Sequence, residues 1–280
     1  MIAFKNKNYP ISAVYLTDSY CLNAFEKEVS YLTSFDTDKL LSGFRETAGI
    51  DTKNKSRYPG WENMLIGGHC VGHYLSACVN AFQNPVCSKN NKEKLILIIS
   101  ELINGFDECQ KKIGTGFLFG AVLTDKKNIE LQFDNVEKNQ TNIITQAWVP
   151  WYTMHKLFEG LIKAASMDSK SYGTIVLKAQ SILSNLTKWI YNRISKWDKN
   201  TLKTVLSIEY GGMNDCLYEY YRLSGNKTAL ECAKIFDDEN LFKTIAYSKK
   251  EQNILNGRHA NTTIPKFTGA LNRYVVTGEK

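Results

Sequence analysis

Apolar residues recur with the 3.6-residue period of an α-helix along most of the chain. The clearest stretch is residues 67–84, in which positions 71, 74, 75, 78, 79 and 82 form one stripe of apolar or small side chains. It predicts a helix with polar chemistry in its first turns that ends at the turn Asn84-Pro85. The same period predicts further helices at residues 18–35, 91–112, 150–166, 171–195, 209–224, 227–237 and 261–277, with a short helical piece or turn at 38–45.

Strand patterns are nearly absent from the sequence. Residues 11–17 lean toward β-structure and stop at Asp18, which we expect to cap the next helix. Residues 117–146 show weak periodicity and many polar side chains, so we expect a long irregular segment there, either a decorated surface loop or a rim over a pocket. The predicted fold class is therefore all-α.

The expected helices come in pairs joined by short polar turns. A helix with a polar entry precedes each turn, and an ordinary amphipathic helix follows the first three turns. Such a repeat is typical of stacked helical hairpins, which close into a ring with their first helices inside. The last turn, Thr277-Gly278, is followed only by Glu279-Lys280. We therefore expect residues 1–280 to form the N-terminal part of one incomplete toroid of helical hairpins.

All four histidines lie at polar entries to apolar helices. His69 and His73 are one turn apart on one face, and the bland interpretation is a pair of hydrogen-bonded core histidines. In a ring of hairpins, however, parallel N-termini bring separate polar side chains to one end. The side chains that we expect there are His69, His73, His155, Glu209, Asn214, His259 and Asn261, with Trp61, Trp148, Trp151 and Tyr152 on the approach.

Convergent polar groups with aromatic walls favour a sugar as the ligand. Sugar hydroxyls need oriented donors and acceptors, and sugar ring faces stack on indole. Basic residues are sparse in these segments, so a neutral hydroxylated ligand is favoured over an anion.

The charge and the cysteine content limit the classes of binding partner and the cellular compartment that we expect. The net charge of +7 is spread over scattered lysines rather than arginine clusters beside aromatic residues, so no nucleic-acid partner is expected. The seven cysteines include no Cys-x-x-Cys and predict reduced core thiols. No signal peptide or membrane-spanning stretch is seen, so we expect no membrane partner and a cytoplasmic location, which is left open should the N-terminus be incomplete.

Five segments together resemble the β-L-arabinofuranosidase family of glycoside hydrolases. They are Gly60-Trp61-Glu62, the run Gly-His-Cys-Val-Gly-His-Tyr-Leu-Ser-Ala at 68–77, Trp-Val-Pro-Trp-Tyr-Thr-Met-His-Lys at 148–156, Glu-Tyr-Gly-Gly-Met-Asn at 209–214 and His-Ala-Asn-Thr-Thr-Ile-Pro-Lys at 259–266. The resemblance implies an (α/α)6 barrel followed by β-sandwich domains. It also implies retaining hydrolysis of terminal β-L-arabinofuranosides, with an arabinose-containing oligosaccharide or glycoside as the partner.

The resemblance further implies a cysteine nucleophile, bound to zinc with two other cysteines and a glutamate, and a second glutamate as the acid/base. In the family those residues follow the motif that His259 opens, and Cys70, Cys78 and Cys216 lie in other motifs. We therefore expect this chain to hold no catalytic residue and no zinc, the rest of the barrel and the β-sandwich domains to be absent from it, and the chain alone to be inactive.

The same resemblance implies which residues of this chain bind the substrate. His155 and His259 match positions that are expected to hydrogen-bond the arabinofuranose hydroxyls, and His69 and His73 match a motif on the same face. The remaining residues expected at this site line or support the pocket: Trp61, Glu62, Tyr152, Glu209, Asn214 and Asn261.

Two other functions stay open. His69 and His73, at positions i and i+4, could bind a metal in a zinc hydrolase or a cyclase on a similar toroid, although no glutamate lies between them as in His-Glu-x-x-His. The chain could also be a non-catalytic helical carbohydrate-binding or scaffold protein, a remnant of the family without its catalytic half.

Overall fold

The computed structural model describes residues 9–248 and 253–279, and these residues form helices and loops without a β-strand. This confirms the predicted all-α class. The chain folds as two compact units. We call Phe4–Ile129 with Lys156–Trp189 the N-terminal unit, and Glu130–His155 with Ile190–Lys280 the C-terminal unit. None of the described helices is long and apolar enough to cross a membrane.

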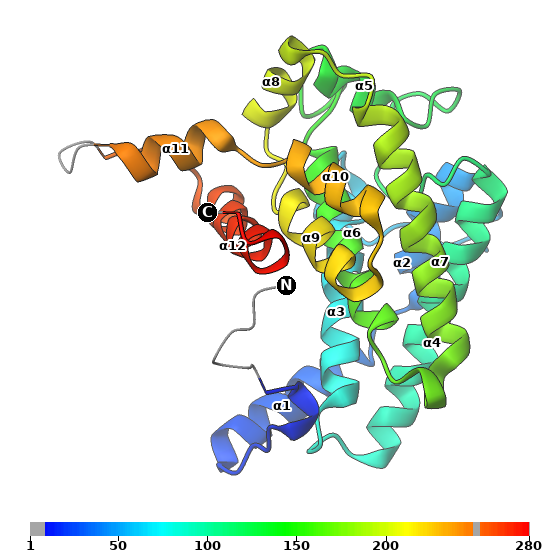
Figure 1. The fold of residues 1–280 in the computed structure, drawn as a ribbon. Helices are drawn as coiled ribbons and strands as arrows, with labels where there is room; N and C mark the ends of the chain where they lie inside the picture. The colour runs from blue at the N-terminus through cyan, green and yellow to red at the C-terminus, as the bar shows by residue number, and fades with distance from the viewer. Residues whose placement is uncertain (1–8, 249–252, 280) are drawn as a thin grey trace. The chain divides into compact units, whose positions relative to one another are not determined.

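The N-terminal unit is built from helices that pack side by side around α3 and α4 (Figure 1). The turn at Asn84-Pro85 joins these two into a hairpin, as the sequence predicts. The elements that begin in this unit are η1 (Ile11–Ala13), α1 (Ser19–Leu32), α2 (Thr37–Ala48), η2 (Gly60–Asn63), α3 (His69–Gln83), α4 (Lys89–Ile113) and α7 (Ser169–Ile194).

Local chemistry sets the ends of these helices. The carboxylate of Asp18 accepts a hydrogen bond from the Cys21 N–H at 2.8 Å, which confirms the predicted cap of α1. Ser88 caps α4 in the same way. Gly114 ends α4 in the left-handed region with φ of 79°, a conformation that glycine adopts without a steric penalty.

Helix α3 and the second half of α6 (Pro150–Ala165) approach each other closely at two glycines. A Cβ placed on Gly72 would lie 2.1 Å from the carbonyl oxygen of Lys156. A Cβ on Gly160 would lie 2.7 Å from the carbonyl oxygen of Gly72. Only hydrogen fits at these positions, so the two backbones are in direct contact inside the N-terminal unit.

The C-terminal unit has its own core, in which aromatic rings surround Trp151. The ring centroids of Phe133, Phe236 and Trp197 lie 4.9, 5.0 and 5.6 Å from that of Trp151. Helix α9 packs on both α10 and α12 (Figure 1). The helices of this unit are α5 (Leu131–Glu137), the start of α6, α8 (Lys199–Ser207), α9 (Met213–Ser224), α10 (Lys227–Ile235), α11 (Glu239–Tyr247) and α12 (Ala260–Thr277).

A cluster of charges fastens α5 to the last turn of α7. The guanidinium of Arg193 pairs with the carboxylates of Glu130, Asp134 and Glu137. The indole N–H of Trp197 donates to the same Glu137 at 2.8 Å. Because one arginine serves three carboxylates, its side-chain entropy is lost once for several pairs.

The long, strongly periodic helices lie where the sequence predicts them, and so do the shorter α9 and α10, whereas α5, α8 and α11 are not predicted. The prediction of β-structure at 11–17 is wrong, because residues 11–13 form a 3-10 helix and residues 14–17 have no regular structure. The segment 117–146, predicted as irregular, contains α5. Helices α8 and α11 are also missing from the prediction, although α10, which has nine residues as well, is predicted at 227–237.

We expect Gly72→Ala to destabilise the protein by about 2 kcal/mol or more, because the new methyl group cannot fit against the Lys156 carbonyl. Urea unfolding followed by circular dichroism measures the change. Gly173→Ala is the matched control, since Gly173 lies in α7 with no atom within 4 Å of its added Cβ. Equal unfolding midpoints for the two variants would contradict the close helix contact.

Candidate functional site

The predicted site residues divide between the two units. Trp61, Glu62, His69 and His73 belong to the N-terminal unit. The C-terminal unit holds the other six: Tyr152, His155, Glu209, Asn214, His259 and Asn261. That the two sets share one mouth stays a prediction, and each set is described by itself.

A cavity of about 750 Å³ opens in the C-terminal unit, and two of the predicted residues, Glu209 and His259, line it. Its wall comes from α8, from the loops before α9 and α12, and from the first turns of α11 and α12. Most of the polar and charged side chains along this wall are Lys199, Lys203, Glu209, Asp238, Arg258, His259, Thr262, Thr263 and Lys266.

His259 is the N-terminal cap residue of α12, and its carbonyl accepts the hydroxyl hydrogens of Thr262 and Thr263 at 3.1 and 2.9 Å. Its imidazole is exposed, with 68% of the side chain open to solvent. The Nδ1 atom lies 3.9 Å from Oε2 of the half-buried Glu209. A donor and an acceptor thus stand side by side at the cavity surface, which suits a hydroxylated ligand.

Lys266 lies deeper in the same cavity. Its ammonium group pairs with Asp238 at 3.1 Å and lies 4.2 Å from the centre of the Tyr210 ring. Burial lowers the pKa of Lys266, although the Asp238 carboxylate opposes that shift. The lining therefore holds more cations than the motif sequences indicate, since Lys199, Lys203 and Arg258 are outside or at the edge of the motifs.

His155 is buried behind a pair of motif glycines. Its Nδ1 accepts the Gly212 N–H at 3.1 Å, so the ring hydrogen of the neutral imidazole sits on Nε2. A Cβ on Gly211 would lie 2.7 Å from Nδ1, and the φ of Gly211 is +61°. Glycine at 211 and 212 therefore allows the turn before α9 to hold the imidazole in one tautomer.

Tyr152 and Asn261 meet although they are far apart in the sequence. The amide nitrogen of Asn261 donates to the Tyr152 hydroxyl at 3.4 Å. Asn214 differs from both, because it is fully buried in α9. Its amide donates to Asp237 Oδ1 at 3.1 Å and to the Lys266 carbonyl at 3.2 Å. Asn214 thus supports the helix that carries the cavity wall.

Asp237 is the acceptor at the centre of this support. It also accepts the Tyr218 hydroxyl at 2.7 Å and the Arg273 guanidinium at 3.1 Å. Burial raises the pKa of Asp237, and the hydrogen bonds from Tyr218 and Asn214 oppose that shift. Each bond therefore compensates part of the cost of holding a carboxylate in the interior.

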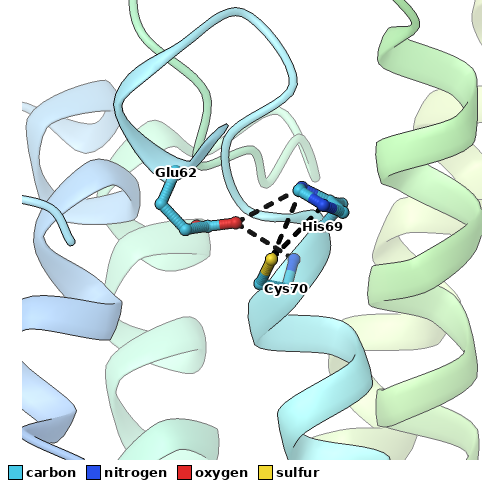
Figure 2. A group of neighbouring side chains, drawn as sticks. All are labelled: Glu62, His69 and Cys70. Atoms are coloured by element: carbon cyan, nitrogen blue, oxygen red, sulfur yellow. Dashed lines mark hydrogen bonds and ion pairs between the residues drawn. The ribbon is translucent and has the colours of Figure 1, made fainter. Parts of the chain in front are cut away.

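In the N-terminal unit, Glu62 organises the entry of α3 (Figure 2). Its two carboxylate oxygens accept the Gly68 N–H at 2.8 Å and the Cys70 N–H at 3.0 Å. Gly68 precedes the helix at φ of +91° and offers no capping side chain. Burial opposes ionisation of Glu62, but the hydrogen bonds from His69, Gly68 and Cys70 outweigh it and lower the pKa of the carboxyl.

His69 and Cys70 adjoin this carboxylate. The His69 Nδ1 atom lies 3.3 Å from Glu62 Oε1 and 2.9 Å from the Ile66 carbonyl oxygen. The Cys70 sulfur lies 3.3 Å from His69 Nε2. Burial, and then the Glu62 charge, raise the pKa of the Cys70 thiol to about 12. Trp61 is 62% exposed, with its ring 6.0 Å from the His69 ring, and His73 is exposed one turn into α3.

The described residues do not fit the zinc site that the resemblance implies. Three cysteines and a glutamate would form it, whereas the one group of potential ligands among the described residues contains a single cysteine, Cys70. His73 is not part of that group, so the structure offers the predicted pair of His69 and His73 no further ligand there.

Sequence patterns missed part of this chemistry. Helix α8, which supplies Lys199 and Lys203 to the cavity, is not predicted from the sequence. Cys70 was interpreted only as a core thiol, because no Cys-x-x-Cys accompanies it. Its neighbour His69 and the preceding Glu62 were the available signal, and only the turn at Gly67-Gly68 brings them together.

We expect Asn214→Ala to destabilise the protein by about 1–3 kcal/mol, because Asp237 and the Lys266 carbonyl each lose a hydrogen-bond donor in the interior. Thermal unfolding measures the loss. Asn200→Ala, at an exposed position of α8, is the matched control and should leave the stability nearly unchanged. An Asn214→Ala protein as stable as the wild type would refute this supporting role.

Comparison with known proteins identifies the family of this chain. No curated protein matches the chain. The profile of the family described as β-L-arabinofuranosidase, GH127 catalytic domain, matches residues 13–280, nearly the whole chain. The helical architecture agrees with the (α/α) toroid expected for such a domain. The protein therefore belongs to the GH127 family of glycoside hydrolases.

Proposed function

We propose that this chain binds the sugar for a glycosidase that removes terminal β-L-arabinofuranosyl residues with retention of configuration. The observation that carries the proposal is the cavity at which His259 and Glu209, from two separate motifs, stand 3.9 Å apart. Family membership supplies the reaction class, and this cavity is a place where a sugar of that class can bind.

The cavity suits one or two sugar rings in size and chemistry. A volume of about 750 Å³ is within the usual range for small-ligand sites. We propose that the exposed imidazole of His259 donates to a ring hydroxyl and that the Glu209 carboxylate accepts from a neighbouring one. A charged acceptor beside a donor binds a vicinal diol well, because each hydroxyl both donates and accepts.

His155 and Tyr152 have a supporting place in this proposal. The Gly212 N–H leaves the His155 hydrogen on Nε2 and fixes the orientation of the buried imidazole. Tyr152, held by Asn261, limits how the start of α6 can move. Trp61, Glu62, His69 and His73 stay predicted members of the substrate site from the family resemblance.

Retaining hydrolysis needs a nucleophile and an acid/base in addition to sugar contacts. We assign neither role within the described residues, because they assemble no group of three cysteines with a glutamate. No step through zinc is derived for this chain. The alternative of a non-catalytic carbohydrate-binding protein shares the binding cavity and differs only in turnover.

We expect the chain to bind methyl β-L-arabinofuranoside, and His259→Ala or Glu209→Gln to weaken that binding about 3- to 10-fold, because the first removes a hydrogen bond to the sugar and the second replaces a charged acceptor by a neutral one. Titration followed by ligand-observed NMR measures the affinity. Lys243→Ala, an exposed substitution on α11 away from the cavity, is the control.

Unchanged affinity in both His259→Ala and Glu209→Gln would contradict the cavity as the sugar site. Inorganic phosphate is the competitor that separates a sugar site from a simple anion site, since the lining carries four lysine or arginine side chains. Displacement of the arabinofuranoside by phosphate but not by free L-arabinose would also count against the proposal.

We further expect the 280-residue chain alone to release no L-arabinose from nitrophenyl β-L-arabinofuranoside, because its described residues bring no second cysteine to a candidate metal-ligand group. Chromatography of the free sugar measures release, with a heat-denatured sample as the blank. Release above the blank that is lost on substitution of a cysteine would overturn this expectation.

A further inference from the structure

Glu62, His69 and Cys70 bring a carboxylate oxygen, an imidazole nitrogen and a sulfur within 4.8 Å of one another (Figure 2). All three residues belong to the N-terminal unit. The carboxylate approaches from η2, and the other two donors come from the first two residues of α3. From this arrangement we propose a binding site for a divalent transition-metal ion of the zinc class, held by these three side chains.

The distances from His69 Nδ1 to the other two donor atoms are close to those of a tetrahedral ligand set. Bonds of about 2.0–2.1 Å to nitrogen and oxygen and about 2.3 Å to sulfur separate the nitrogen and oxygen ligands by about 3.4 Å, and nitrogen and sulfur by about 3.6 Å. The His69 Nδ1 atom lies 3.3 Å from Glu62 Oε1 and 3.9 Å from the Cys70 sulfur. These two distances are within a few tenths of an ångström of the tetrahedral values, and the carboxylate and sulfur, which lie within 4.8 Å of each other, close on the ion by side-chain rotation.

The backbone holds the carboxylate in place without the metal. Glu62 accepts two main-chain N–H groups at the start of α3, and the lone pair of Oε1 that faces His69 becomes available to an ion once the His69 hydrogen has moved to Nε2. Capping alone explains why Glu62 is present. It does not explain why an imidazole and a thiol lie on the same side of that carboxylate, because capping uses only the backbone of residues 68 and 70.

Binding requires a defined change in the protons. In the metal-free protein the Ile66 carbonyl, 2.9 Å from His69 Nδ1, is an acceptor and holds the ring hydrogen on that nitrogen. When Nδ1 ligates the ion, the hydrogen of the neutral imidazole sits on Nε2 and the ring turns slightly away from Ile66. The Cys70 thiol gives its proton to solvent and binds as the thiolate, while Glu62 binds as the carboxylate.

The donor set selects the class of ion. One sulfur and one nitrogen favour zinc or cobalt over calcium and magnesium, which prefer oxygen ligands. Three protein ligands leave a fourth position for water or a small ligand, as in open zinc sites. Glu62 and Cys70 are partly exposed, which gives an ion a route from solvent. This set has one cysteine, so it is distinct from the cysteine-rich site of the family.

Cobalt(II) reports directly on the proposed sulfur ligand. We expect the reduced 280-residue chain to bind one Co²⁺ with a thiolate-to-cobalt charge-transfer band and visible bands of tetrahedral intensity, and Zn²⁺ to displace it. Cys70→Ser should remove the charge-transfer band and weaken zinc binding about 10-fold or more. Cys21→Ser, at an exposed cysteine of the same unit, should bind as the wild type does.

A second measurement needs no variant. Zn²⁺ should slow alkylation of Cys70 by iodoacetamide in the wild-type chain, and should leave alkylation of Cys21 unchanged, as read by peptide mass spectrometry. A charge-transfer band that persists in Cys70→Ser would overturn the proposal. So would the absence of the band from the wild type, or alkylation of Cys70 at the same rate with and without Zn²⁺.

Discussion

The contact of α3 with the second half of α6 is the constraint on which the N-terminal unit depends. At Gly72 the two backbones touch with no room for a Cβ, so the direction and the axial position of α3 are set by main-chain atoms. Side chains can change rotamer, whereas a backbone contact cannot yield without moving a whole helix. Everything carried by the first turn of α3 therefore has a defined position: the imidazole of His69, the thiol of Cys70, and the N–H groups that Glu62 accepts.

The same contact shows that the glycines and the histidines of the motif at 68–77 are present for different reasons. In the run from Gly68 to Ala77, Gly72 is required by packing, and Gly68 by the left-handed turn before the helix. His69 and His73 are required by neither. A sequence pattern presents all four as equivalent motif residues. Only the backbone positions show that the two glycines allow the turn and the helix contact, and that the two histidines are the side chains that this backbone positions.

How much of the fold and of the site could be predicted from the sequence depends on how clearly the sequence pattern marks each helix. Helices α3, α4, α6 and α7 are long enough for several turns of apolar periodicity, and their positions follow from it. The nine residues of α8 make little more than two turns, so few apolar positions mark them, whereas the equally short α10 is predicted because it follows the polar turn after α9. The part of the cavity wall that α8 supplies is therefore not predicted. Glu209 and His259 are predicted, because each lies just before a helix, α9 or α12, that the sequence pattern indicates.

The solvent exposure of each predicted site residue shows whether it can contact a ligand or instead supports the fold, which the motif sequences do not show. Asn214 is fully buried, and both of its amide hydrogens are used inside the fold, so a sugar gains nothing from it directly. The side chain of His259 is 68% exposed beside a cavity and makes no capping hydrogen bond to α12. Burying a polar side chain is justified energetically by the hydrogen bonds it makes within the fold, and exposing one leaves those bonds for a ligand. The residues that recognise a sugar should therefore be sought among the exposed motif positions, and those that hold them among the buried ones.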